Sequence, residues 1–403
     1  MMTTLQARNP YTGELDYTFE SVPPSGVKAT CDRVRANQPA WAAMGVEARI
    51  EALQTFAKVC EQNFDSLFDA LKTDTGRALI AQYEVGSVTG VLERLIGDAR
   101  TMLVDPPMRD TMGPGVQGCG QWVPYGVLGN ISPWNFPLIL SLVDTFPALL
   151  SGNAAVIKPS EVTPRWVDPF VECIKQVPEL YNVFDVVRGA GETGAELINH
   201  VDVIAFTGSV RTGRMVAEAC AKRFIPCFTE LGGKDPAIVL DSANLEAATS
   251  GILRASVAAT GQACQSLERV YVQAPIYDAF VEKIVAKAGE VTLNTHQLEQ
   301  GHIGPLIFEK QAETIQSHLD DAVAKGANIL HGGKIIEQGG LWIEPTILVD
   351  VTQDMKVITD ETFGPVIPIT KFDKVDDAIA MANDTVYGLS GSVYGDADEA
   401  INI

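Results

Sequence analysis

The stretch YGVLGNIS (125–132), with PLILSLVDTFPALLSG (137–152) and AAVIKPS (154–160) after it, decides the fold of this chain. The first and last segments are short apolar runs of strand length, and the middle segment is a longer apolar run that ends at Gly152. A strand, a helix and a second strand in this order are typical of a parallel sheet with both faces covered. The sequence therefore predicts an α/β fold.

The same alternation continues to about residue 240. Further strands are predicted at 184–189, 201–208, 227–229 and 236–240, and further helices at 165–177, 193–200 and 209–223. Upstream, residues 28–103 place apolar residues three and four apart, which predicts helices. The Pro- and Gly-rich stretch 106–120 predicts a hairpin that leaves the domain. After about residue 250 the alternation is less regular, so we expect a second doubly wound α/β domain.

Composition excludes several classes of partner. The 403 residues suit two or three domains, and the net charge of -21 disfavours nucleic acid and anionic membrane surfaces. No apolar run approaches the roughly 18 residues that span a bilayer, and the first ten residues predict no secretory signal. Seven scattered cysteines without a CxxC pair predict neither disulfides nor a structural zinc site, and they suit the cytoplasm. The five histidines show no metal-ligand spacing, so no metal is expected.

Two glycine turns are candidates for binding phosphate. GAGETG (189–194) fits the dinucleotide pattern between a strand and a helix, but the next strand ends without the expected acid. A simple tight turn explains it equally well. FTGS (206–209) offers a second turn at a helix N-terminus, where a pyrophosphate could bind. In KPSE (158–161), Lys158 and Glu161 could reach ribose hydroxyls, although a capped helix start is the commoner meaning of such a motif.

Three further motifs carry groups that suit acyl chemistry. In SPWNFP (132–137) two prolines clamp Asn135, whose amide could stabilise an oxyanion, unless the segment is only a helix entry. In TELGGKDP (229–236) Glu230 is either a general base or a solvated turn residue. In GQACQSLERVYV (261–272) Cys264 is either a packed thiol or a nucleophile.

Together, in this order and spacing, the motifs resemble the aldehyde dehydrogenase superfamily. The resemblance begins at NPYTGE (9–14) and covers essentially the whole chain. It runs through PWNFP, KPSE, the GxG turn, FTGS, ELGGK, GQxC, ETFGPV (361–366) and NDTVYGLSGSVY (383–394).

The resemblance implies a role for each matching residue. Cys264 is the nucleophile, Glu230 the general base, and Asn135 with the Cys264 backbone N–H the oxyanion hole. Lys158 and Glu161 hold the adenosine ribose, Ser209 the pyrophosphate, and Glu361 with Phe363 the nicotinamide ribose. The implied catalytic set is Cys264, Glu230, Asn135 and Lys158. The implied cofactor-binding set is Ile131, Ser132, Pro133, Trp134, Lys158, Ser160, Glu161, Gly189, Gly191, Phe206, Gly208, Ser209, Thr212, Leu231, Glu361 and Phe363.

The resemblance also implies the domains and the assembly. Residues 1–106 and 125–232 form a Rossmann-like NAD-binding domain, 107–124 an oligomerisation hairpin, and 233–403 the catalytic domain. A cytoplasmic homodimer or homotetramer is expected. The family's chain continues beyond DEAINI (398–403) with a segment that pairs with the hairpin and lines the substrate entrance. We therefore expect a dimer with weakened tetramers.

The implied reaction is oxidation of a small aldehyde to a carboxylic acid with NAD, or alternatively NADP, as hydride acceptor. The glutamate at 230 favours hydrolysis of the thioester over transfer to coenzyme A. Semialdehyde-specific relatives tend to carry arginine where this chain has Val143, so an apolar aldehyde is expected. The alternatives are a truncated, non-catalytic paralogue that acts as a binding or structural protein and, as a minor option, a coenzyme A-acylating enzyme.

Overall fold

The computed structural model describes residues 3–403, which form two compact units. Unit 1 comprises the residues up to Ala7, 16–74 and 80–230, and unit 2 comprises 8–15, 75–79 and 231–403. Two short segments that the sequence prediction gave to the first domain, 8–15 and 75–79, thus belong to unit 2.

Local contacts explain where these two segments lie. The Tyr11 ring packs edge-on against Trp342 at 5.6 Å, and Asn294 Nδ2 donates to the Gly76 carbonyl at 2.9 Å. Both partners, Trp342 and Asn294, come from the second half of the chain. The sequence pattern did not indicate that either would contact the N-terminal part. The longest segment of unit 2 begins at Leu231.

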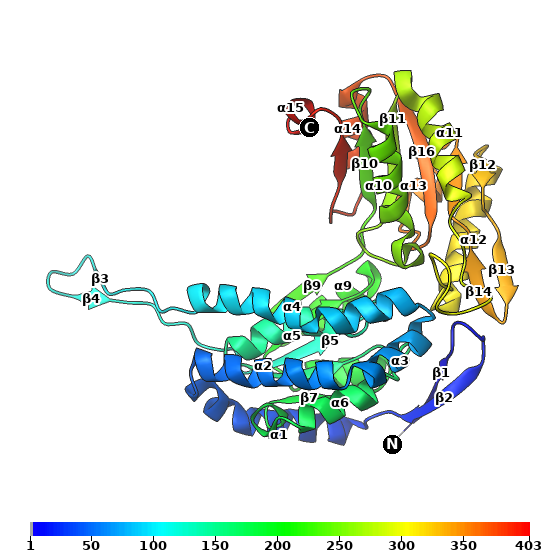
Figure 1. The fold of residues 1–403 in the computed structure, drawn as a ribbon. Coiled ribbons are helices and arrows are strands. Elements are labelled where there is room, and N and C mark those ends of the chain that lie inside the picture. The colour runs from blue at the N-terminus through cyan, green and yellow to red at the C-terminus, as the bar shows by residue number, and fades with distance from the viewer. Residues whose placement is uncertain (1–2) are drawn as a thin grey trace. The chain divides into compact units, whose positions relative to one another are not determined.

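Unit 1 is built on a five-stranded parallel sheet with the order β7-β6-β5-β8-β9 (Figure 1). The strands are β5 Val127–Ile131, β6 Ala154–Lys158, β7 Phe184–Val186, β8 Val203–Thr207 and β9 Cys227–Glu230. The chain passes from β5 outward to β7 and then returns to β8 beside β5, which places the topological switch point between β5 and β8. Ligands bind in open α/β sheets at this point, outside the carboxyl ends of the strands.

Helices cover both faces of this sheet. On one face α5 packs against β5 and β6, with α2 and α6 beside it; on the other face α1 and α8 pack together over β5 and β6, with α9 next to α8. The helices are α1 Pro24–Ala43, α2 Val46–Gln62, α3 Phe64–Thr75, α4 Ala78–Met102, α5 Ile139–Leu150, α6 Val167–Lys175, α7 Pro178–Tyr181, α8 Gly191–Ile198 and α9 Val210–Lys222. The predicted alternation of strands and helices is confirmed, and the three central strands β5, β6 and β8 are the buried, mostly apolar runs that predicted it.

An aromatic cluster holds α2, α5 and α6 onto the sheet. Phe56 of α2 lies edge-on to Phe146, Phe170 and Phe184, with ring centroids 5.6–6.3 Å apart. All four side chains are fully buried. Edge-to-face contacts of this kind add to the burial of apolar area, so this cluster is the main core of unit 1 on that face.

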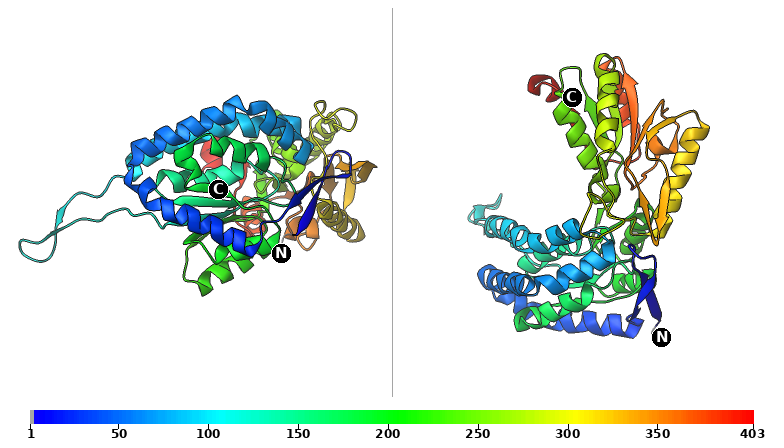
Figure 2. Two further views of the ribbon diagram at one scale, coloured as in Figure 1. Left: turned by 90° about the horizontal axis from the view of Figure 1, so that it is seen from below. Right: turned by 45° about the vertical axis from the view of Figure 1, so that its right-hand side comes forward.

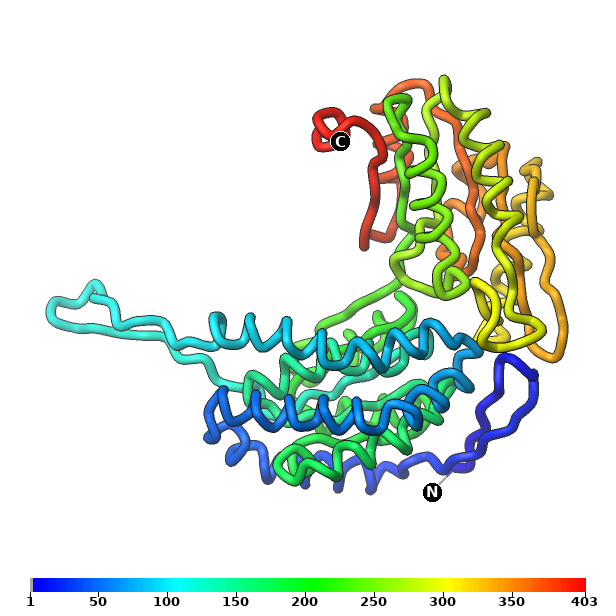
Figure 3. The backbone as a smooth tube through the Cα atoms, in the orientation of Figure 1, coloured from blue at the N-terminus to red at the C-terminus, as the bar shows by residue number. Residues whose placement is uncertain are grey.

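Two two-stranded ribbons accompany unit 1. Strands β1 Thr4–Arg8 and β2 Leu15–Glu20 pair near the N-terminus, and β3 Arg109–Asp110 pairs with β4 Gln117–Gly118 between α4 and β5. The β3–β4 hairpin extends away from the helices of unit 1, as Figure 2 (left) and Figure 3 show. A hairpin in this region is the element that the Pro- and Gly-rich stretch predicted.

Unit 2 contains a six-stranded sheet with the order β12-β15-β16-β11-β10-β17. Only β12 is antiparallel to its neighbour in this sheet. The strands are β10 Asp235–Val239, β11 Leu267–Gln273, β12 Asn328–His331, β15 Thr346–Val349, β16 Val366–Phe372 and β17 Ser392–Tyr394, and a separate ribbon pairs β13 Ile335–Gln338 with β14 Gly340–Ile343.

The helices of unit 2 again cover both faces of the sheet. On one face α10 and α11 pack together, and on the other α12, α13 and α14 enclose two further clusters of buried side chains. The helices are α10 Leu245–Val257, η1 Ala258–Gly261, η2 Ala274–Ile276, α11 Tyr277–Ala288, α12 Glu309–Ala324, α13 Lys356–Thr359, α14 Val375–Asn383 and α15 Ala397–Ala400. Within residues 3–403 no helix is both long and apolar enough to cross a membrane.

Candidate active site

The loop after β5 is a rigid turn at the switch point of unit 1. It carries four of the predicted site residues, which are Ser132, Pro133, Trp134 and Asn135, and a fifth, Ile131, ends β5. The Ser132 amide donates to the Lys158 carbonyl at 3.1 Å, which ties the loop to the end of β6. Thr163 Oγ1 donates to the Trp134 carbonyl at 3.3 Å, and Asn135 is only 4% exposed. The amide of Asn135 is therefore held by its surroundings, as an oxyanion donor needs to be.

Glu84 of α4 fixes the other end of this loop. Its Oε2 accepts the backbone N–H groups of Leu138 and Ile139, both at 3.1 Å, where α5 begins. A carboxylate at a helix N-terminus satisfies amides that have no partner within the helix and interacts favourably with the helix dipole. Because Glu84 is fully buried, this contact holds α5 and the Asn135 loop together inside unit 1.

The KPSE motif brings two predicted ribose ligands into contact. Lys158 Nζ lies 2.9 Å from Glu161 Oε2, with the lysine almost buried and the glutamate side chain 41% exposed. Ser160 Oγ accepts the Val162 N–H at 3.2 Å and so fixes the turn between them. Lys158 ends β6, and its carbonyl accepts the Ser132 N–H of the loop that carries Asn135.

Both glycine turns lie where the sequence predicted them. A Cβ added at Gly189 would lie 1.9 Å from Thr193 Oγ1, so the chain can approach the start of α8 only with glycine there. Gly191 is the first residue of α8. In the second turn Gly208 lies against the Phe206 ring, and Ser209 caps α9 by accepting the Thr212 N–H at 3.3 Å.

Glu230 ends the edge strand β9 next to the second turn. The Gly208 N–H donates to the Glu230 carbonyl at 3.0 Å, and Glu230 pairs with Thr207 of β8. Its side chain is exposed. Burial, and then the charge of Glu230, raise the pKa of Asp144 on α5 to about 6. Unit 1 therefore brings a second carboxyl group close to the predicted general base, and the sequence analysis did not identify this group.

Cys264 lies in unit 2, in the loop between η1 and β11. The thiol is half-buried, and burial is the main cause that raises its pKa, with smaller contributions from the charges of Glu361 and Asp235. The backbone N–H groups of Gln265 and of Cys264 itself act in the opposite direction, because they stabilise the thiolate. All seven cysteines, each within residues 3–403, are free.

The backbone just before Cys264 is strained. Ala259, Thr260 and Gly261 have consecutive φ values of 54°, 62° and 66°, and the first two are not glycine. Gln262, fully buried, holds this turn by donating to the Ala259 and Pro305 carbonyls, both at 3.2 Å, and by accepting the Ile307 N–H at 2.8 Å. Such strain persists only where the surroundings fix it, and it is common near functional groups.

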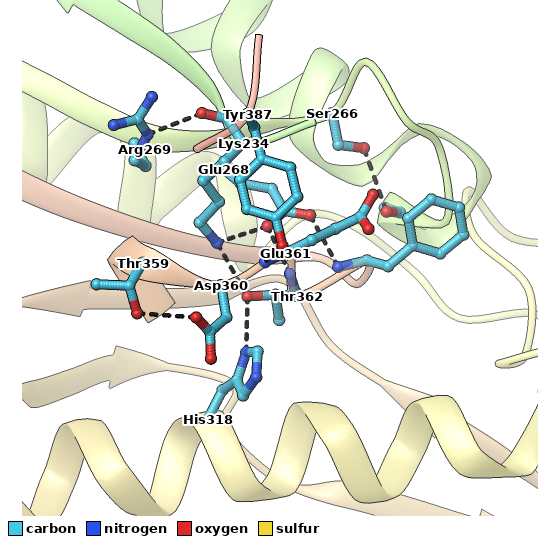
Figure 4. A network of polar contacts seen from close by, with 12 residues as sticks. Lys234, Ser266, Glu268, Arg269, His318, Thr359, Asp360, Glu361, Thr362 and Tyr387 are labelled. Carbon is cyan, nitrogen blue, oxygen red and sulfur yellow. Dashed lines mark hydrogen bonds and ion pairs between the residues drawn. The ribbon is translucent and has the colours of Figure 1, made fainter. Parts of the chain in front are cut away.

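The third candidate segment precedes β16 and carries Glu361 and Phe363. The Glu361 carboxylate lies against the Gly232–Gly233 turn, where a Cβ on Gly232 would be 2.2 Å from Oε2. Burial, and then the charge of Glu268, raise the pKa of Glu361 to about 7, and the Gly233 N–H partly opposes this. Figure 4 shows Glu361 beside Lys234, Glu268 and Thr362. Leu231, the remaining predicted residue, is the first residue of the long third segment of unit 2.

The predicted residues thus form two groups. Unit 1 brings together Asn135, Lys158, Glu161, Ser209 and Glu230 around the ends of its strands, and unit 2 brings together Cys264, Glu361 and Phe363. Within residues 3–403 no group of three His, Cys, Asp or Glu side chains is arranged to hold a metal ion. The sequence analysis missed Glu84, Asp144, Lys234 and Glu268. Lys234 and Glu268 stand inside two of the quoted motifs. The available signal was a charged residue directly before, or within, an apolar run of strand length.

Comparisons with known proteins agree with the motif pattern. The model of the Aldehyde dehydrogenase family matches residues 2–403. A Mycolicibacterium smegmatis protein, provisionally named an NADP(+)-dependent succinate-semialdehyde dehydrogenase, is 38% identical over 91% of this chain and 72% of its own length. Glutarate-semialdehyde dehydrogenase of Pseudomonas putida is 36% identical over 97% of this chain and 82% of its own.

A solved structure extends the agreement to the fold. A protein of Anabaena variabilis that carries the provisional name aldehyde dehydrogenase PutA superimposes with a TM-score of 0.97. It is 48% identical, and the match covers 99% of this chain and 86% of that chain. The predicted α/β fold and the resemblance drawn from the motifs are both confirmed. The chain belongs to the aldehyde dehydrogenase family.

Proposed function

We propose that this protein oxidises an aldehyde to a carboxylic acid, with Cys264 as the nucleophile and a nicotinamide dinucleotide as the hydride acceptor. The observation that carries the proposal is the Cys264 loop, in which a half-buried thiol lies shortly after two strained residues, Ala259 and Thr260, and two backbone N–H groups stabilise its thiolate. Because burial raises the pKa of the thiol, the resting group is protonated at neutral pH and needs a base. Glu230, an exposed carboxylate at the end of β9, has that role in the proposal.

The oxidation step joins the Cys264 sulfur to the aldehyde carbon. The thiol proton passes to Glu230, the carbonyl π pair moves to oxygen, and the resulting alkoxide is stabilised by the Asn135 amide and the Cys264 N–H. NAD(P), when bound, accepts the hydride that leaves this carbon. A carbonyl then re-forms as a thioester on Cys264.

Hydrolysis of the thioester completes the cycle. Glu230 first passes the thiol proton to solvent and then removes a proton from a water molecule. The hydroxide adds to the thioester carbonyl, and the carbon–sulfur bond breaks to release the acid. General-base assistance of this kind contributes typically about 10²–10⁴-fold. The thiolate regains its proton, so the chain returns to its starting state.

The residues of unit 1 fit a dinucleotide. Ser209 caps a helix of 13 residues, and the first turn of such a helix presents backbone N–H groups and a positive dipole to a pyrophosphate. The Lys158–Glu161 pair offers one donor and one acceptor for the two hydroxyls of a ribose. We prefer NAD to NADP, because the Glu161 carboxylate would repel a 2′-phosphate.

For the substrate, we favour an aldehyde without a second carboxylate. Helix α5, which follows the Asn135 loop, contains no lysine or arginine and places Val143 beside the acidic Asp144. Because relatives are named for succinate and glutarate semialdehyde, these two compounds are the substrates against which other aldehydes should be compared. Hexanal and benzaldehyde should therefore have a higher kcat/KM than either semialdehyde.

The assembly and the compartment are also part of the proposal. We favour a cytoplasmic homo-oligomer, because seven free thiols suit a reducing compartment and apolar side chains are exposed on unit 1.

Replacement of Glu230 with glutamine tests the mechanism, because it keeps the shape of the side chain and removes the proton acceptor. In a stopped-flow experiment the variant should release at most one NADH per active site in a burst, followed by a steady state slower by about 10²–10⁴-fold. Cys264→Ala should show neither phase.

Two outcomes would favour the alternatives. A wild-type chain that reduces neither NAD nor NADP with any aldehyde would support a non-catalytic paralogue. A steady-state rate that needs coenzyme A would support acyl transfer instead of hydrolysis.

A further inference from the structure

Unit 2 contains a buried ion pair that the proposed mechanism does not use. Lys234 Nζ lies 2.6 Å from Glu268 Oε2, and the two side chains are 0% and 3% exposed. Lys234 stands immediately before β10, and Glu268 is the second residue of β11. A buried pair of this kind often contributes little net stability, because both charges lose their hydration. Its hydrogen bonds to a neighbouring loop point to a task other than stability.

The Glu268 carboxylate binds the backbone of the segment that carries Glu361 and Phe363. Oε2 accepts the Thr362 N–H at 2.7 Å, and Oε1 accepts the Phe363 N–H at 2.8 Å. Lys234 Nζ completes the arrangement by donating to Thr362 Oγ1 at 3.1 Å. Figure 4 shows the Lys234 ammonium between the carboxylate and the threonine hydroxyl. The pair thus holds two consecutive amides and one side chain of the same loop.

This loop needs such support, because its backbone is not in a favoured conformation. Phe363 has a φ of 51°, in the left-handed region that a bulky residue enters only where its surroundings impose it. Two further contacts hold the residue before it: Gln311 Nε2 donates to the Thr362 carbonyl at 2.6 Å, and His318 Nδ1 lies 3.2 Å from Thr362 Oγ1. Among these contacts, the Glu268 carboxylate is the group that bonds the two consecutive N–H groups of Thr362 and Phe363.

We propose that Lys234 and Glu268 are positioning residues that fix Glu361 and Phe363 for the nicotinamide ribose. This inference rests on the proposed function, in which Glu361 and Phe363 contact that ribose. A carboxylate is required because two N–H groups and an ammonium all point at it, and only an ionised carboxyl group accepts from all three. The Lys234 ammonium, 2.6 Å from Oε2, supplies the opposite charge beside the buried carboxylate.

The test compares cofactor-dependent with cofactor-independent chemistry at Cys264. In Glu268→Gln the amide nitrogen would face one of the donors, so one loop contact is lost while the shape stays the same. We expect the KM for NAD to rise at least ten-fold. The ratio of aldehyde oxidation to hydrolysis of p-nitrophenyl acetate, which acylates a thiol without a hydride acceptor, should fall at least ten-fold. Glu282→Gln, on the exposed face of α11, is the matched control.

A double-variant experiment separates positioning from general damage to the fold. If Glu268 acts through the loop, its effect should shrink once Glu361 is altered. Glu268→Gln should then lower the ratio of aldehyde oxidation to ester hydrolysis by no more than about three-fold when Glu361→Gln is already present. Glu268→Asp, which keeps the charge on a shorter side chain, should recover part of the loss. Lys234→Met/Glu268→Gln leaves no unpaired buried charge, so this variant remains informative if Glu268→Gln alone does not fold. This double variant should show the same ten-fold fall in the ratio of oxidation to ester hydrolysis.

The possible failures are distinct. If the wild type is active and a folded Glu268 variant has an unchanged ratio, or loses both activities equally, the positioning role is wrong and the proposed function stands. If the wild type reduces neither NAD nor NADP, the proposed function is wrong and the positioning role fails with it.

Discussion

Three glutamates have different tasks in the proposal because their surroundings differ. Glu161 is paired with Lys158 at 2.9 Å, Glu230 ends an exposed edge strand, and Glu361 is packed onto the Gly232–Gly233 turn. The first suits a fixed hydrogen-bond acceptor, the second a base in contact with water, and the third a carboxyl group that burial keeps partly protonated near neutral pH.

At Glu161 the prediction concerns the choice of cofactor. Glu161→Ser removes the negative charge that would face a 2′-phosphate and keeps a hydroxyl for hydrogen bonding. The value of kcat/KM for NADP should rise by about ten-fold, which corresponds to about 1.4 kcal/mol, and that for NAD should fall. Initial rates with both cofactors at one aldehyde concentration measure the ratio. A wild type that already uses NADP as well as NAD would contradict the role given to Glu161.

At Glu361 the prediction concerns stability and pH. Its folded pKa is raised to about 7 from the ordinary 4.5, so the folded chain binds an extra proton between these values. The contribution of Glu361 to stability is therefore complete below pH 4.5 and is lost as the pH rises through 7. The loss amounts to at most about 3 kcal/mol, and to less where water reaches the carboxylate. Glu361→Gln should gain stability relative to the wild type between pH 5 and pH 8.

Urea unfolding of both proteins across this range provides the measurement. Glu290→Gln, at an exposed position after α11, is a suitable control because its profile should follow that of the wild type. Parallel profiles for Glu361→Gln and the wild type would show that the carboxyl group titrates normally.

At the scale of the elements, the two units present their candidate residues at opposite ends of parallel strands. In unit 1 the residues follow β5, β6 and β8 or end β9, as expected for a doubly wound sheet. In unit 2 Lys234, Cys264 and Glu361 all precede strands, namely the neighbours β10, β11 and β16. Because these strands are adjacent and parallel, the three segments meet at one edge of the sheet. This explains how Glu268 and Lys234 reach the loop before β16.

The contact between α4 and α5 gives the element-scale prediction. Glu84→Gln removes a carboxylate that accepts two amides at the start of α5, and such caps are worth about 0.5–2 kcal/mol. The thermal midpoint should fall by a few degrees. Because Asn135 precedes this helix start, kcat should fall by about ten-fold while the KM for NAD changes little.

Glu93→Gln, on the exposed face of α4, is the control for this experiment. A rise in the KM for NAD as large as the fall in kcat would indicate that Glu84 supports the cofactor site and not the Asn135 loop.

The sequence predicted the sheet of unit 1 well, because its central strands β5, β6 and β8 are buried runs of mostly apolar residues. It also proposed individual site residues from their motifs, and their roles stay predictions. It could not predict Glu84, because the amides that Glu84 binds lie 54 positions or more along the chain. It could not predict Asp144, because the charge that acts on it, Glu230, belongs to another element. The placement of 8–15 and 75–79 in unit 2 likewise depends on contacts such as Tyr11 with Trp342, which leave no local pattern.

At the scale of the whole molecule, unit 1 exposes apolar side chains near the end of α9 and on β9. Phe224 is 97% exposed, and Met215 and Phe228 are also exposed. Single exposed apolar residues are common, but a group on one helix and the adjacent edge strand is typical of an interface. We therefore expect a second copy of the chain to cover this surface.

Phe224 makes this expectation testable, because it follows α9 with a φ of 55°, at a position that usually takes glycine or asparagine. Phe224→Asn should relieve the backbone, stabilise the isolated chain by about 1 kcal/mol, and remove the side chain from the interface. The dimer dissociation constant should then rise at least ten-fold in light scattering over micromolar concentrations. Val323→Ala, which removes an exposed apolar side chain from α12, should leave the constant unchanged. A wild type that is monomeric at these concentrations, or a Phe224→Asn chain that dimerises equally well, would mean that this surface does not hold two copies together.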